Sequence, residues 1–181
     1  MSANTIDTLR YPIGPFARRD RYTDADRAES VARMTALPSA LAAAISGLSD
    51  AEYEVPYRDG GWTVRQLVHH LADSHAHALI RLKLALTENE PTIKAYDQDA
   101  WVLLADVRDV SPLVSVAMLA ATHERMTAVL RAMKAEEFSR AFMHPENGRM
   151  TIDDLVGMYA WHGDHHVAHV TGMRERGRDR G

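Results

Sequence analysis

Four of the ten histidines lie within nine residues near the C-terminal end of the chain, in the sequence W-H-G-D-H-H-V-A-H from 161 to 169. The apolar residues around this stretch repeat with a helical period, so each histidine can be assigned to a face by counting about 100° per residue. His162 and His166 fall near the middle of the apolar stripe, one turn apart. Two imidazoles so placed can reach a single metal ion beside the helix, and a third ligand must then come from another element.

The other two histidines of this stretch take different positions. His165 lies well to one side of the stripe, and we interpret it as a solvated or interface residue. His169 lies near the edge, where it could line a pocket or support a ligand. The alternative to a metal site is that the inward pair, His162 and His166, belongs to the core. Each buried ring would then need a hydrogen-bond partner that the sequence does not show, so the spacing favours a metal site.

Candidates for a third ligand lie on the helix with the clearest start signal. Thr63, with Gln66 three residues later, is typical of a capping box and predicts a helix from 63 to about 87. This helix carries His69, His70, His75 and His77. Counting alone puts His75, not His70, at the centre of its apolar stripe. Periodicity therefore leaves the identity of the third ligand open.

Three more amphipathic helices are expected. One runs from 23 to about 48 and begins with the capping pair Thr23 and Asp26. One runs from 111 to about 134, with Pro112 at its first position. One begins at Thr151, with Asp154 as its capping partner, and carries the four histidines between 161 and 169. His123 faces inward on the 111–134 helix, and we interpret it as a core residue while keeping it as a candidate for function.

The segments between the helices carry turn signals. Two prolines and a glycine within residues 1–22 exclude a helix and predict an extended arm packed on the body. Residues 88–110 form a connection longer than a bundle usually needs, which either covers a site or serves as a strap with Trp101 in the core. Residues 136–150 are expected to be a loop or hairpin. The chain is thus predicted to be a single domain, 1–181, folded as an all-α four-helix bundle with an extended N-terminal arm.

Composition excludes several classes of protein. The net charge of −4 and the lack of a long basic stripe argue against nucleic acid as a partner. The sequence shows neither a signal peptide nor an apolar run long enough to suggest a membrane span, so we expect a cytoplasmic protein without a membrane partner. With zero cysteines, any metal must be bound by nitrogen and oxygen ligands.

Spacing excludes further metal chemistry. No glutamate lies three residues before any histidine, so the Glu-x-x-His pairs of di-iron bundles are missing. The H-E-x-x-H motif of helical metalloproteases is also absent. What remains is a mononuclear site built from histidines on facing helices.

From residue 11 to about 175 the chain resembles the YfiT-type metal-dependent hydrolases of the DinB superfamily, which also includes bacillithiol S-transferases. Four motifs carry the resemblance: Y-P-I-G-P-F at 11–16, P-Y-R-D-G-G-W-T-V-R-Q-L-V-H-H-L-A-D-S-H at 56–75, Y-D-Q-D-A-W at 96–101, and W-H-G-D-H-H-V-A-H at 161–169. The resemblance implies a four-helix bundle, often a homodimer, with one divalent metal ion per chain, zinc or nickel. In the family's pattern the ligand of the second helix precedes a leucine, which implies His70. The pair in the last helix falls on His162 and His166.

Three neutral imidazoles leave a divalent ion with open positions, as in a catalytic site. The function expected first is therefore a metal-dependent hydrolase that activates water for attack on a small-molecule substrate. Two alternatives use the same site: a transferase that activates a low-molecular-weight thiol, and a metal- or ligand-binding dimer without catalysis. No general base is evident, and Asp73, Tyr96, Asp97 and His123 are the candidates for catalytic contacts. Because the ligands must be neutral, metal affinity is expected to fall below about pH 6.

Overall fold

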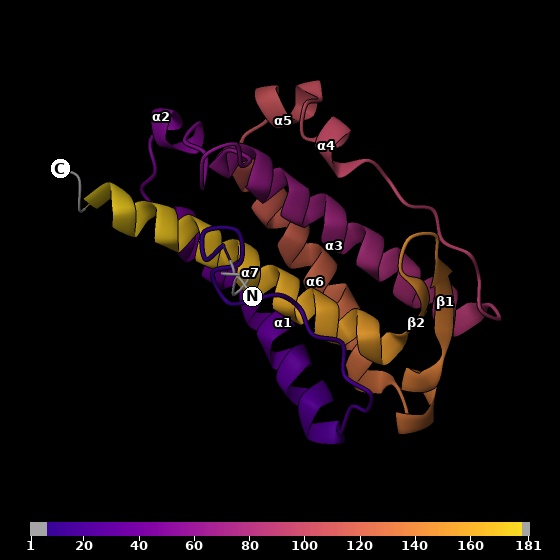
Figure 1. Ribbon diagram of the computed structural model, residues 1–181. Helices are drawn as coiled ribbons and strands as arrows, with labels where there is room; N and C mark the ends of the chain where they lie inside the picture. Colours follow the sequence, from indigo (N-terminus) through magenta and orange to yellow (C-terminus); the bar gives the residue numbers. More distant parts are fainter. Residues whose placement is uncertain (1–6, 179–181) are drawn as a thin grey trace, which may run out of the picture.

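The computed structural model describes residues 7–178, which form four long helices with shorter elements between them (Figure 1). In chain order the elements are α1 (Asp24–Ile45), α2 (Asp50–Tyr53), α3 (Val64–Thr87), α4 (Gln98–Trp101), α5 (Ala105–Asp109), α6 (Pro112–Ala132), the 3-10 helix η1 (Ala135–Ser139), β1 (Ala141–His144), β2 (Gly148–Thr151) and α7 (Ile152–Arg178). The predicted all-α bundle is confirmed, and all four long helices lie where the sequence places them.

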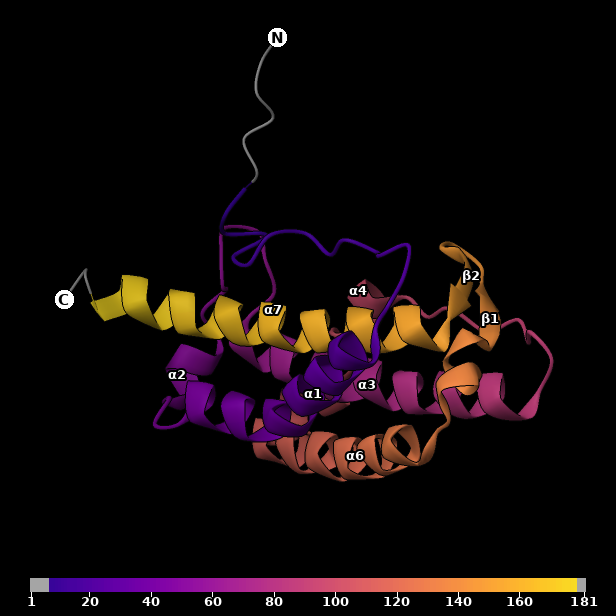
Figure 2. The same cartoon turned by 90° about the horizontal axis from the view of Figure 1, so that it is seen from below.

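The four long helices form a ring in which α1 packs against α7 and α6, and α3 packs against the same two helices. Figure 2 shows α7 and α6 at opposite edges with α1 and α3 between them. Of the consecutive pairs of long helices, only α3 and α6 are therefore neighbours in the ring. The approach of α1 to α7 depends on Gly163, because a Cβ there would lie 2.5 Å from Cδ2 of Leu37.

Capping boxes begin three of the long helices, as the sequence predicts. In α3 the Gln66 amide donates to Oγ1 of Thr63 at 3.2 Å, and the Thr63 amide donates to the Gln66 side chain at 2.9 Å. The same reciprocal pair joins Thr151 and Asp154 at the start of α7. These caps satisfy amides that have no partner within the helix. They fix where α3 and α7 begin, and so which of their residues face each other.

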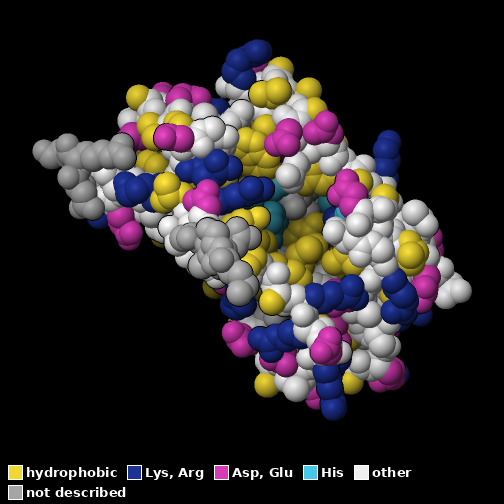
Figure 3. All heavy atoms as spheres, in the orientation of Figure 1, with side chains coloured by type: hydrophobic (Ala, Val, Ile, Leu, Met, Phe, Trp, Pro, Cys, Tyr) yellow, Lys and Arg dark blue, Asp and Glu magenta, His cyan; other side chains and the backbone are white. Residues whose placement is uncertain are grey.

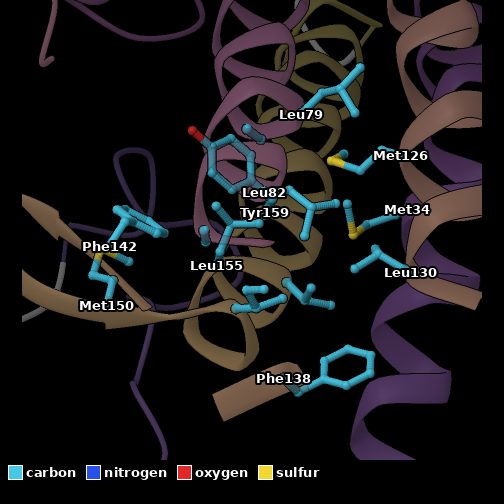
Figure 4. Packing of buried hydrophobic residues seen from close by; sticks show 14 of the residues in the cluster. Met34, Leu79, Leu82, Met126, Leu130, Phe138, Phe142, Met150, Leu155 and Tyr159 are labelled. Carbon is cyan, nitrogen blue, oxygen red and sulfur yellow. The ribbon is translucent and has the colours of Figure 1, made fainter. Parts of the chain in front are cut away.

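The apolar core consists of two clusters, one toward each end of the bundle. One includes Met34, Leu82, Met126, Leu155 and Tyr159 (Figure 4). The other is built from residues nearer the opposite end of each helix: Leu41 of α1, Leu67 and Leu71 of α3, Leu119 of α6 and Val170 of α7. On each of three helices a buried histidine lies between the residues of the two clusters: His75 on α3, His123 on α6 and His166 on α7. The bundle thus has a polar layer of histidines between two apolar ones.

The segments between the long helices differ in part from expectation. The 88–110 connection contains two short helices, α4 and α5, that the sequence does not predict. Trp101 is only partly buried and lies against Tyr96 and His77, with ring centroids 4.5 and 5.4 Å away, so it does not plug the core. The 136–150 segment folds as η1 and an antiparallel hairpin of β1 and β2, in agreement with the predicted loop or hairpin.

The predicted extended arm is confirmed for residues 7–22, and the rest of it lies outside the described residues. The arm runs across α7 (Figure 2). Nε1 of Trp161 donates to the carbonyl of Gly14 at 3.1 Å, and Phe16 packs against the same indole ring. Nε of Arg18 donates to Asp154 at 2.8 Å. The arm is therefore attached to α7 at several points along its length.

By length and composition α6 could cross a membrane. In the bundle its inner face carries Leu119, Met126 and Leu130, which are buried against α3 and α1. The apolar character of this helix is thus used partly in the core, as is common for bundle helices.

Candidate metal centre

Three histidine rings meet between α3 and α7. Nε2 of His162 lies 3.3 Å from Nε2 of His70 and 3.1 Å from Nε2 of His166. His70 and His166 are buried, whereas His162 is partly exposed. Figure 3 shows histidine side chains at the floor of a hollow near the middle of one face. Of the two candidates on α3, His70 therefore lies at the Nε2 side of the pair on α7, whereas His75 reaches only Nδ1 of His162.

A chain of hydrogen bonds runs away from His162 across the bundle. Nδ1 of His162 lies 3.2 Å from Nε2 of His75, Nδ1 of His75 lies 2.7 Å from Nε2 of His123, and Nδ1 of His123 lies 2.5 Å from the carbonyl of Met34. A carbonyl can only accept, so Nδ1 of His123 carries the proton. In neutral rings the same reasoning places a proton on Nδ1 of His75 and then on Nδ1 of His162. Nε2 of His162 is left as a bare lone pair.

A second chain orients His166 in the same way. Nε2 of His169 lies 3.1 Å from the carbonyl of Arg10 and must donate to it. Nδ1 of His169 is then an acceptor, and it lies 3.3 Å from Nδ1 of His166. His166 therefore donates through Nδ1 and keeps a lone pair on Nε2. The expectation that His169 supports a ligand is consistent with this arrangement.

Burial keeps these rings neutral. It lowers the pKa of His70 and of His169 to about 4, and lowers the pKa of His75, His162 and His166 well below 6.5. Neighbouring histidines lower the pKa of the last three further, because a second positive charge there would be repelled. A proton is thus a poor occupant of the space between the three Nε2 atoms.

The cluster fits a divalent metal ion. Two lone pairs, on His162 and His166, face each other at 3.1 Å, which is unfavourable unless a cation lies between them. Around a tetrahedral ion with metal–nitrogen distances of about 2.0–2.1 Å, ligand nitrogens stand roughly 3.3–3.4 Å apart, close to the observed spacing. Neutral imidazoles without thiolate or carboxylate suit several divalent transition metals, among them zinc, copper, iron and nickel.

His70 lacks the kind of outer partner that the other two rings have. Its Nδ1 is buried with no hydrogen-bond partner among residues 7–178. Its ring instead packs against Trp62, with centroids 4.6 Å apart. Trp62 immediately precedes the Thr63 cap, so the start of α3 and the position of this ring are linked. The adjacent His69 points elsewhere, with Nδ1 2.8 Å from Oγ of Ser115 on α6.

A cavity of about 630 Å³ opens beside His162. Tyr96 and Asp97, two of the candidates from the sequence, line it. Burial raises the pKa of Tyr96 to about 12, so this phenol is a proton donor at neutral pH. The loop before α4 therefore lines this cavity, as expected if the 88–110 connection covers a site.

The other two catalytic candidates do not line this cavity. Asp73 is partly buried, and burial raises the pKa of its carboxyl group, with the charge of Asp106 adding to the effect. Among the described contacts it makes no hydrogen bond to His70. His123 is buried in the bundle and reaches the cluster only through His75. The expectation that it is a core residue agrees with its position, although its hydrogen bond links it to the site.

Of the two interpretations of His165, as a solvated or an interface residue, the first is wrong. The residue is 7% exposed, and its ring stacks on Trp161 and packs against Tyr11 of the arm. Face counting treats everything away from the bundle as solvent, and it could not show that the arm covers this side of α7. His165 and His169 form a second histidine cluster with His166, but there Nδ1 of His166 is the atom that donates to His169.

Several residues of the cavity were missed by the sequence analysis: Ser74, Arg81, His144 and Tyr159. Tyr159 falls in the apolar stripe of α7, so periodicity alone treats it as a core residue. The one available signal was Arg81, a charged residue on the buried side of α3 between Ala78 and Leu82. An arginine at such a position needs a reason, and periodicity alone does not supply one.

Known proteins resemble this chain in both sequence and structure. The sequence profile of the DinB superfamily matches residues 33–170. The "Putative metal-dependent hydrolase YfiT" of Bacillus subtilis strain 168 is 41% identical over 173 residues, covering 95% of this chain and 97% of that one. A "Putative metal-dependent hydrolase" of Bacillus cereus strain 03BB102 is 42% identical over 171 residues, covering 94% and 98%.

Two solved structures share the fold. The structure of YfiT from Bacillus subtilis, described as having an unusual four-helix bundle topology, superposes with a TM-score of 0.92 at 41% identity, covering 94% of this chain and 98% of that one. The four-helix bundle protein TT2238 superposes with a TM-score of 0.54 at 19% identity, covering 78% and 94%, which supports the fold alone.

Proposed function

This chain belongs to the DinB superfamily, and we propose that it is a hydrolase whose single divalent ion, zinc or nickel, is bound through Nε2 of His70, His162 and His166. The observation that carries the proposal is the pair of lone pairs on His162 and His166, directed at each other by two chains that end on backbone carbonyls. The names of the YfiT-type relatives support the same class of reaction.

The residues of the chain have distinct roles in this proposal. His75 and His169 orient two of the ligands, and Trp62 covers the third. A divalent ion bound there would polarise the bond under attack and lower the pKa of a water toward neutrality, which supplies the nucleophile for hydrolysis. Tyr96 can donate a hydrogen bond to a substrate in the cavity, and Asp97, at its exposed rim, can accept one.

Metal analysis with matched variants tests the site. We expect about one divalent ion per chain, and His70→Ala, His162→Ala or His166→Ala should each weaken binding by well over tenfold, because a three-ligand site has none to spare. His69→Ala is the control, since it removes a buried histidine of the same helix that turns toward Ser115. Full metal retention in His166→Ala would contradict the proposal.

Turnover assays separate hydrolysis from the alternatives. The metal-loaded protein should hydrolyse 4-nitrophenyl esters without a thiol, with a rate that rises with pH through an apparent pKa of about 7, and His162→Ala should abolish this. Turnover that appears only when a small thiol and an electrophile are supplied would indicate the transferase instead. A fully metallated protein inactive in both assays would be a binding protein.

We further propose a cytoplasmic homodimer that acts on a small molecule, as the family resemblance implies. The outer face of α6 exposes Leu113, Val114 and Met118, which a second copy would cover. Light scattering on the purified protein should give the mass of a dimer, and Val114→Glu together with Met118→Glu should shift it toward the monomer.

A further inference from the structure

Arg81 on α3 is a buried cation without a counter-ion in the part of the chain that the structure describes. The residue is 6% exposed, and its one hydrogen bond to a described residue is from Nη1 to the hydroxyl of Tyr159, at 3.1 Å. Its Nε is buried and has no partner, and none of the ion pairs found among residues 7–178 includes it. A buried guanidinium is normally paired with a carboxylate because its desolvation is costly. The pairing group is missing from the described chain.

The guanidinium borders the cavity beside the histidine cluster. Arg81, Tyr159 and His162 all line it, together with the polar side chains of Ser74 and Asn147. In Figure 4 the hydroxyl of Tyr159 points away from the apolar cluster that holds its ring. The hydrogen bond from Arg81 to this hydroxyl is therefore made at the edge of the core, where a ligand in the cavity can reach both groups.

The groups closest to Arg81 do not balance its charge. Burial lowers the pKa of His77 and of His144, and the charge of Arg81 lowers both further, so these rings are neutral at pH 7. The phenol of Tyr96, with its pKa raised by burial, is also neutral. The carboxylates that line the cavity, Asp97 and Glu146, are exposed and form no ion pair with Arg81 in the described structure. The positive charge of Arg81 in the cavity is thus not balanced by any of these groups.

We propose that Arg81 binds a carboxylate group of the substrate, at the end of the molecule remote from the bond that reacts at the histidines. A carboxylate matches the planar fork of a guanidinium and carries the single negative charge that one arginine balances. A phosphate dianion would instead bring excess negative charge near Glu146 and Asp97. This assignment rests on the proposed function, because it takes the histidine cluster as the place of reaction.

The positions of the two groups constrain the shape of the substrate. Arg81 lies eleven residues beyond His70 on α3, which corresponds to roughly 16 Å of helix rise. The long side chain of arginine can span part of the distance from there to the histidine cluster. The carboxylate must therefore be separated from the reacting bond by several atoms. An elongated monoanion, or the monoester or monoamide of a dicarboxylic acid, has this form.

A pair of isosteric probes tests the assignment on the metal-loaded protein. The monoanion adipamate, which is the monoamide of adipic acid, and its neutral counterpart adipamide have the same length, and calorimetric titration should show that adipamate binds at least tenfold more tightly. Arg81→Met should remove this preference, and Arg81→Lys, which keeps the charge but loses the fork, should keep part of it. Arg125→Met is the matched control, because it removes the same charge from an exposed position on α6.

The unfolding temperature of Arg81→Met is a second measurement. If Arg81 had a purely structural role, the variant should unfold at a lower temperature than the wild type. Because the charge is unpaired in the free protein, Arg81→Met should unfold at the same temperature as the wild type or at a higher one. Equal binding of the two probes by the wild type, or an unchanged preference in Arg81→Met, would overturn the assignment. If the metal-loaded wild type hydrolyses no ester but still binds the anionic probe more tightly than the neutral one, the proposed reaction is refuted while the carboxylate site at Arg81 stands.

Discussion

At the scale of single residues, which nitrogen of His162 carries the ring proton is set by a hydrogen-bond acceptor on the far side of the bundle. Whether a neutral imidazole offers a lone pair or an N–H group to a metal depends on what its other nitrogen contacts. For His162 that contact passes through His75 and His123 to the carbonyl of Met34. Each ring in the chain has the same tautomer, with the proton on Nδ1.

Replacing His75 with phenylalanine tests whether this chain acts on metal binding. The change keeps an aromatic ring in a fully buried position but removes the acceptor for the Nδ1 proton of His162. We expect divalent-metal affinity to fall by about tenfold to a hundredfold, as when other outer partners of metal ligands are removed. Competition with a chelating dye measures this. His69→Phe should leave the affinity near wild type, and a folded His75→Phe protein with undiminished affinity would show that the chain has no such role.

The residues of the cluster differ in how far the sequence could predict them. His162 and His166 follow from counting, because α7 turns one face to the site. His70 does not, because α3 is buried on two sides, against α6 and against α7, and the centre of its apolar stripe lies between them. The fully buried His75 lies nearer that centre, so only the resemblance to a family favoured His70. Outer contacts such as that of His169 with Arg10 join distant segments, and no periodicity reports them.

At the scale of elements, the N-terminal arm takes part in the site although it has no regular structure. Its Arg10 carbonyl accepts the hydrogen bond that sets the tautomer of His169, and Tyr11 covers His165. The arm is anchored further along by Gly14 and by Arg18. Its first described residues can therefore be removed while the anchors nearest α1 stay in place.

A chain that begins at residue 13 should bind metal more weakly than the full chain. The truncation removes the acceptor of His169 and opens one side of the histidine layer, so the metal should dissociate at least tenfold faster into excess chelator. Arg10→Ala, which keeps the carbonyl and loses only the side chain, is the matched control and should behave as wild type. Equal dissociation rates for the truncated and full chains would mean that the arm has no effect on the site.

The long helices could be placed from sequence because their signals are local. A capping threonine and its partner lie three residues apart, and the caps at Thr63 and Thr151 both form as expected. The short helices α4 and α5 could not be found in this way. Elements of four and five residues contain too few positions for periodicity. They are stabilised by tertiary contacts instead: α5 packs against α3, and Trp101 of α4 contacts His77 of α3.

At the scale of the whole molecule, the histidine layer makes stability depend on pH. Burial lowers the pKa of His70, His165 and His169 to about 4 in the folded chain, from an ordinary value of 6.5. Between these values the unfolded chain binds more protons than the folded one. The free energy of unfolding therefore decreases as pH falls from about 6.5 toward about 4.

Urea unfolding of the metal-free protein at pH 7.5 and pH 5.0 measures this effect. Each pKa unit corresponds to about 1.4 kcal/mol, so several shifted histidines should together lower the free energy of unfolding by a few kcal/mol at the lower pH. Equal values at the two pH values would rule out the expected linkage. The sequence predicts that metal affinity falls below about pH 6, a value that applies to histidines with an ordinary pKa. Because burial lowers the pKa of these histidines, the fall in metal affinity should occur at lower pH in the protein that remains folded.

Both hydrogen-bond chains end on the main chain, at the carbonyls of Met34 and Arg10. A point mutation can delete a side-chain acceptor, but every amino acid supplies a backbone carbonyl. Arg10, whose side chain is exposed, should therefore tolerate almost any replacement over the course of evolution without altering the proton pattern of the site. Insertions or deletions in the arm would shift the backbone carbonyl, so natural selection should remove them. Relatives should therefore be more uniform in the length of the arm before α1 than in the residue type at position 10.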